Sequence, residues 1–138
     1  MNIYKLPCDW LISIPTDWQF EYDEYDGQCV FFPKDSDLTI RITPFHAAKD
    51  NVPASAEIME NAYIKSIPKS AKLRDANSMI LNGFKVKMYE NTLIENHKTV
   101  YVIYVGYYSA GELLSVSVWG TNKAECEQAL NILRTIKR

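Results

Sequence analysis

The pattern of hydrophobic and polar residues is clearest between Phe84 and Trp119, where it predicts three long strands joined by tight turns. Residues 84–88 alternate between apolar and polar side chains, a period of two that is typical of a strand with one buried face. Residues 100–105 are apolar at every position, which predicts a central strand covered on both faces of its sheet. We therefore expect a β-sheet with further layers packed against both sides.

Shorter strands are expected on either side of a predicted first helix, and turn residues separate them. Residues 10–14, 20–22, 29–32 and 38–42 have strand character, and Pro44 is expected to end the fourth strand. Asp26-Gly27 predicts the hairpin turn between the second and third of these strands. Residues 72–81 predict one more strand, which runs into a type I′ hairpin turn at Asn82-Gly83.

Two segments have the three- and four-residue spacing of amphipathic helices. Residues 54–67 bring Met59 and Tyr63 to one side, and Pro68 ends the pattern. Residues 122–136 carry an apolar stripe that includes Cys126 and Leu130. The order is ββββ-α-ββββ-α, so the sequence predicts an α+β fold: a mainly antiparallel sheet flanked by two helices, an α/β/α sandwich, in a single domain of residues 1–138.

The opening motif Ile14-Pro15 followed by Trp18, together with this order of elements, resembles the PsbP-like superfamily. That superfamily includes the photosystem II extrinsic subunit, a Ran-binding nuclear regulator, DcrB-like proteins and small uncharacterised bacterial domains, and the resemblance points to this last branch. It implies an antiparallel sheet flanked by helices. It also implies a partner-binding role rather than a catalytic one, and it assigns no functional residue to this chain.

Charge and hydropathy narrow the choice of partners. The formal net charge is −2 and the basic residues are scattered, so we expect no nucleic-acid partner. No apolar segment approaches the length of a membrane span, and the N-terminal residues lack the apolar stretch of a signal peptide. We expect a cytoplasmic protein with no membrane partner, either a monomer or a weak homodimer.

The cysteines and histidines give no pattern of known chemistry. Cys8, Cys29 and Cys126 are widely spaced and form no Cys-x-x-Cys pair, so we expect no structural metal site and no cofactor. Cys29 and Cys126 are expected in the core. We assign no catalytic residue. The alternative is a small hydrolase or isomerase that uses His46 or an acidic pair in a cleft lined by tyrosine and tryptophan.

The strongest charge feature is an acidic and aromatic segment between residues 17 and 27. A calcium loop of the EF-hand type does not fit, because aligning Gly27 with the loop glycine places Pro33 where the final glutamate belongs. A solvated hairpin is the simpler interpretation, and a docking surface for a basic protein is the more specific functional one. The binding residues predicted for that surface are Asp17, Trp18, Tyr22, Asp23, Glu24, Tyr25 and Asp26.

Aromatic residues also gather on the strand of residues 99–108. It contains Tyr101, Tyr104, Tyr107 and Tyr108, which suit either sheet packing or a binding pocket. Gly106 interrupts this strand, and a glycine there predicts either a bulge or a large neighbouring side chain packed over it.

Overall fold

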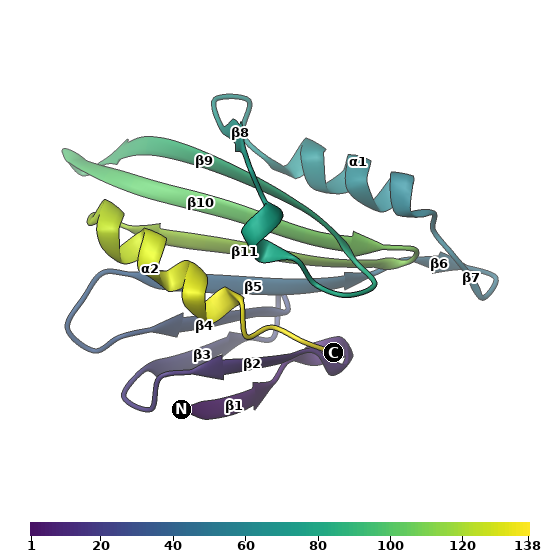
Figure 1. The fold of residues 1–138 in the computed structure, drawn as a ribbon, viewed down its shortest axis with the longest axis horizontal. Helices are drawn as coiled ribbons and strands as arrows, with labels where there is room; N and C mark the ends of the chain where they lie inside the picture. The colour runs from purple at the N-terminus through teal and green to yellow at the C-terminus, as the bar shows by residue number, and fades with distance from the viewer.

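The computed structural model describes residues 1–138 as an α+β fold with one large sheet and two helices (Figure 1). The helices are α1 (Ala56–Ser66) and α2 (Lys123–Leu133). The strands, in chain order, are β1 (Asn2–Lys5), β2 (Leu11–Ile14), β3 (Gln19–Asp23), β4 (Gln28–Phe32), β5 (Thr39–His46), β6 (Ala48–Lys49), β7 (Val52–Pro53), β8 (Lys72–Arg74), β9 (Lys85–Glu95), β10 (Lys98–Ser109) and β11 (Glu112–Gly120).

The large sheet has seven strands in the order β3-β4-β5-β11-β10-β9-β8, and every neighbouring pair is antiparallel. β10 lies between β9 and β11, as its continuous apolar sequence predicts, and its residues from Val102 to Tyr108 are buried. β1 and β2 form a separate hairpin, and β6 and β7 form a third, very short one. The fold class and the antiparallel sheet expected from the sequence are therefore confirmed.

Layers cover the two faces of the large sheet unequally. On one face, α2 and the β1–β2 hairpin pack over the main core, which contains Ile103, Val105 and Tyr107 from β10. The opposite face carries α1, whose Met59 and Tyr63 pack with residues of β10 and β11. Figure 1 views the sheet from the α2 side and shows α1 on the β9 side of the sheet, far from β3.

Local signals in the sequence explain where the helices begin and end. The Ser55 side chain accepts a hydrogen bond from the backbone N–H of Ile58, and the Asn122 side chain accepts one from Glu125. Each cap satisfies a backbone donor that has no partner inside its helix. α1 ends at Ser66, two residues before Pro68, because the residue before a proline is pushed out of helical geometry.

The prediction for the N-terminal region and for the end of β5 was wrong in two respects. Residues 2–5 form β1, which pairs with β2 and lays Tyr4 against Phe31 with ring centroids 5.1 Å apart. β5 also continues through Pro44 to His46. β4 pairs with β5 only from Ile40 to Ile42, so the missing N–H of Pro44 interrupts no ladder on that side.

The segment before β9 is less regular than the single strand predicted for residues 72–81. β8 stops at Arg74, and a 3-10 turn follows at residues 77–79. Gly83 has a positive φ of 82°, whereas Asn82 does not, so the turn here is not of type I′. The type I′ pattern occurs between β9 and β10, where Asn96 and His97 have φ values of 50° and 65°.

Candidate functional sites

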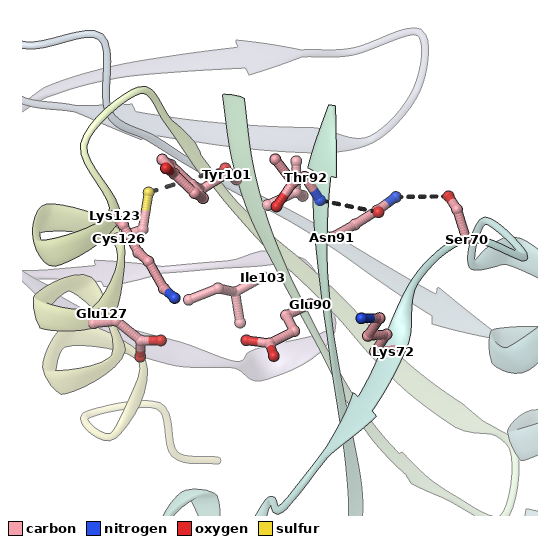
Figure 2. A pocket seen from close by; sticks show the side chains of 11 residues that line it. Ser70, Lys72, Glu90, Asn91, Thr92, Tyr101, Ile103, Lys123, Cys126 and Glu127 are labelled. Atoms are coloured by element: carbon pink, nitrogen blue, oxygen red, sulfur yellow. Dashed lines mark hydrogen bonds between the residues drawn. The ribbon is translucent and has the colours of Figure 1, made fainter. Parts of the chain in front are cut away.

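A polar pocket of about 240 Å³ lies between α2 and the β8–β9–β10 side of the sheet. Figure 2 shows Lys123 and Glu127 of α2 on one side of it, Lys72 of β8 on the other, and Glu90 and Ile103 between them. The remaining lining residues are Ser70, Asn91, Thr92, Tyr101, Val102 and Cys126. Four separate elements therefore meet at one hollow in the surface.

An arginine beside this pocket joins three of these elements through charged hydrogen bonds. The Arg74 guanidinium donates to both carboxylate oxygens of Glu127, at 2.7 and 3.1 Å, and to Glu90 at 3.3 Å. The hydrogen bond from Arg74 is the main reason that the pKa of Glu127 lies below its usual range. Both carboxylates are thus occupied by Arg74, while Lys72 and Lys123 form no ion pair.

The thiol in this pocket is not set up as a nucleophile. Burial raises the pKa of Cys126 to about 11, and three nearby carboxylates, Glu125, Asp37 and Glu127, act in the same direction. Its sulfur lies 4.0 Å from the carbonyl oxygen of Tyr101. A reactive cysteine needs a lowered pKa, so this thiol packs in the core as the sequence predicts. Cys29 is also buried and its pKa is raised by burial.

The acidic and aromatic segment forms the hairpin of β3 and β4. β3 is an edge strand of the large sheet, and all five of its residues are exposed. Tyr25, in the turn, is 99% exposed, and Tyr22 is 46% exposed. Trp18 differs, because it is half-buried and packs against the main core. Six of the seven predicted binding residues therefore lie exposed along one edge, and Trp18 anchors its start.

One carboxylate of this hairpin holds the turn itself. Oδ1 of Asp23 accepts hydrogen bonds from the backbone N–H groups of Tyr25, at 2.9 Å, and Asp26, at 3.4 Å. Gly27 follows with a φ of 66°, a conformation that glycine adopts without strain. Asp23 is thus a turn-forming residue as well as a charged one. Glu24 and Asp26 make no side-chain hydrogen bond or ion pair, so their charges are free.

An open apolar hollow of about 450 Å³ lies beside the hairpin. Phe20 and Tyr22 project into it from β3, and Leu6, Pro7 and Cys8 line it from the N-terminal segment. Phe20 is 42% exposed although it contacts the rings of Tyr4 and Phe31. No pattern in the sequence marks Phe20 as a binding residue, because the hollow forms only when the N-terminal segment packs beside β3.

The residues of the enzyme alternative do not converge. His46 lies exposed at the end of β5, opposite Glu112 in the ladder, and its side chain makes no hydrogen bond. The carboxylate of Glu112 is paired with Arg138 instead. His97 occupies the turn between β9 and β10. Within the structure no group of three histidine, cysteine or acidic residues is placed to hold a metal ion.

The tyrosines of β10 belong mostly to the packed layers. Tyr104, Tyr107 and Tyr108 are buried, and only Tyr101 reaches the polar pocket. The glycine among them is explained by a large neighbour: a Cβ on Gly106 would lie 2.4 Å from the ring of Tyr63. Of the two outcomes predicted for that glycine, the packed neighbour is correct.

The sequence does not predict the residues of the polar pocket. Arg74, Glu90 and Glu127 are 16 and 37 residues apart along the chain, and no motif links them. Arg74 lies on β8, an edge strand of three residues that is too short for its periodicity to be recognised in the sequence. Neither α1 nor α2 has the length and the apolar composition that a membrane-spanning helix requires.

Comparisons with known proteins give a shared fold. No protein-family model matches the chain, and no curated protein matches it. A crystal structure from Bacteroides thetaiotaomicron VPI-5482 superposes on 97% of this chain with a TM-score of 0.72 and 13% sequence identity. The match covers 47% of that protein, so this chain spans about half of its length. LpqN of Mycobacterium tuberculosis, described as involved in cell envelope biogenesis, matches 94% of this chain and 83% of its own, with a TM-score of 0.54 and 17% identity.

Proposed function

We propose that this chain is a non-enzymatic, cytoplasmic protein-binding module that docks a basic protein through the β3–β4 hairpin. The observation that carries the proposal is the exposure of one acidic and aromatic edge. Five carboxylates lie between residues 17 and 26 with no lysine or arginine among them, although the whole chain carries only −2. A concentrated negative potential at an exposed edge attracts a positively charged partner and speeds their association.

The hollow beside the hairpin supplies the apolar part of such an interface. Phe20 and Tyr22 present large, stiff rings that lose little conformational entropy on binding. An apolar side chain of the partner would enter the hollow, while its lysines or arginines would face Glu24 and Asp26 at the turn. This division into an apolar centre and a charged rim is the usual anatomy of a protein interface.

Other observations agree with a binding role inside the cell. All three cysteines are free, as is usual in a reducing compartment. The resemblance to the PsbP-like superfamily also favours binding over catalysis. No specific observation favours the hydrolase or isomerase alternative, because its candidate histidine has no partner.

The test is a charge-reversal variant that leaves the turn intact. Asp17, Glu24 and Asp26 are replaced by lysine, and Asp23 is kept because it accepts the hydrogen bonds of the turn. Proteins captured on the wild-type chain from the native host are identified, and their association rates are measured at low and high salt. We expect the variant to associate roughly tenfold or more slowly at low salt, and the difference to shrink at high salt.

A matched control carries the same change in net charge elsewhere. Asp50, Glu57 and Glu95 are exposed and lie outside the hairpin, so their replacement by lysine alters the total charge without altering this edge. Both variants should unfold close to the wild-type midpoint, since exposed charges contribute about 0–1 kcal/mol each. Equal slowing by the two variants, or no slowing by the first, would show that the hairpin is not the docking surface.

A further inference from the structure

The face of the large sheet that carries α1 is covered at one end only. The buried cluster between α1 and the sheet contains Met59, Tyr63, Tyr108 and Leu113, with no residue of β3, β4 or β5. α1 contacts β10 and β11, and Figure 1 shows it on the β9 side of the sheet, away from β3 and β4. The α1-side face of β3, β4 and β5, here called the open face, is therefore a sheet surface without a second layer.

The register places unlike side chains in a row across the open face. Glu21 of β3 pairs with Val30 of β4, and Val30 pairs with Arg41 of β5. Gln19, two residues before Glu21 on β3, pairs with Phe32 of β4. Since side chains alternate between the faces, Val30 and Phe32 lie on the same face of β4. In this row an acidic residue of β3 and a basic residue of β5 thus flank an apolar residue of β4.

The two charges in this row have no ion-pair partner within the chain. The guanidinium carbon of Arg41 lies 4.6 Å from the centroid of the Trp119 ring, which holds this cation against the sheet. Neither Arg41 nor Glu21 takes part in any of the five ion pairs of the structure. They are separated by β4, which is about two strand spacings or roughly 10 Å from one backbone to the other.

We propose that a second copy of this chain packs against the open face, about a two-fold axis that runs parallel to the strands above β4. A half-turn about that axis lays β3 of one copy over β5 of the other. Glu21 then faces Arg41 of the second copy, and the reciprocal pair forms by symmetry. Val30 and Phe32 meet their own counterparts at the axis. Sheets stack about 10 Å apart, a gap that extended glutamate and arginine side chains bridge once Arg41 turns from the Trp119 ring toward the second copy.

The charge pattern selects a second copy as the occupant, and it also selects the axis. A surface with an acid on one side of an apolar row and a base on the other is complementary to itself under this rotation. An axis above β5 would instead set Arg41 against Arg41, and like charges across an interface are strongly unfavourable. α1 leaves this arrangement free, because it packs over β10 and β11, on the other side of β5 from the axis.

The dimer leaves the proposed docking hairpin accessible. Phe20 and Tyr22 alternate with Glu21 along β3, so their side chains point to the opposite face of the sheet. The inference therefore does not rest on the proposed function, and either of the two can fail without the other.

Sedimentation equilibrium over a range of protein concentrations, combined with a charge swap, tests the dimer. The wild type should sediment as a dimer in a concentration-dependent equilibrium. Arg41→Glu and Glu21→Arg should each weaken the dimer by about a hundredfold or more, because each creates two like-charge contacts. The double variant R41E/E21R should restore it, since the pairs are then reversed and again opposite.

The control is Lys85→Glu, which reverses an exposed charge at the start of β9, three strands away from β5 in the sheet. It should leave the dimer unchanged, and circular dichroism checks that every variant is folded. A wild type that remains monomeric at all concentrations overturns the proposal. So does a dimer that survives both single reversals, or one that the double variant fails to restore.

Discussion

Single residues in this chain are constrained most where the sheet meets α1. Gly106 is buried beneath Tyr63, whose ring occupies the place that any side chain on Gly106 would need. Tyr63 is itself fully buried, and its hydroxyl has no hydrogen-bond partner. The close approach of strand and helix therefore depends on the absence of one methyl group, and it leaves a polar atom unsatisfied.

Adding that methyl group should destabilise the protein. We expect Gly106→Ala to lower the free energy of unfolding by about 1–3 kcal/mol, since overpacking a closed core forces neighbours to move. Urea denaturation measures the change. In a Tyr63→Leu background the ring is gone, so the same substitution should cost less there. If the cost is equal in both backgrounds, the ring of Tyr63 is not what excludes a side chain at residue 106.

At the scale of elements, turn chemistry decides how the long strands pair. Asn96 and His97 both adopt positive φ, so the hairpin of β9 and β10 places a histidine where type I′ turns favour glycine. Asn82-Gly83 has the typical sequence of such a turn but only its glycine has positive φ. Eleven residues of β9 pair with β10, and this pairing imposes the type I′ geometry on Asn96 and His97 although their sequence is not typical of such a turn.

Replacing His97 with glycine should stabilise this hairpin. Glycine adopts a φ near 65° without the steric cost that histidine has there, and Asn-Gly is the favoured type I′ pair. We expect His97→Gly to raise the free energy of unfolding by about 0.5–1 kcal/mol, measured by urea denaturation. Gly83→Ala is the converse control and should destabilise, because φ at residue 83 is 82°. A loss of stability in His97→Gly would mean that the imidazole makes a contact that matters.

At the scale of the whole molecule, the central strands and both helices bury titratable groups in uncharged form. Burial raises the pKa of Tyr63 and of Tyr107, and it raises that of Cys126 to about 11. In the unfolded chain, a cysteine loses its proton near pH 9 and a tyrosine near pH 10. The folded state consequently retains protons that the unfolded state releases.

Stability should therefore fall at alkaline pH. These three groups contribute their full stability below about pH 9, and the contribution is lost as pH rises toward the folded-state pKa values. Each group adds a slope of up to about 1.4 kcal/mol per pH unit within its own window. Urea midpoints measured between neutral and strongly alkaline pH report this slope, and Tyr63→Phe should reduce it above about pH 10. A midpoint that stays constant up to about pH 11 would contradict the prediction.

The sequence by itself determined the main elements, because their signals are local. The alternation in β9, the apolar run of β10, the apolar stripes of both helices and the acidic hairpin all follow from neighbouring residues. Apolar residues recur along the buried face of a strand or helix with the period of that element, and a long element repeats this pattern several times. The α+β class and the position of the hairpin could be predicted for this reason.

Only the tertiary structure decided the rest, because it depends on contacts between distant residues. β1 has no periodic signal of its own and exists through its pairing with β2. The bonds of Arg74 to Glu90 and Glu127 require β8, β9 and α2 to meet. The row of Glu21, Val30 and Arg41 requires the register of three strands. A shift of one residue in that register would move these side chains to the other face, so packing, not propensity, places them together.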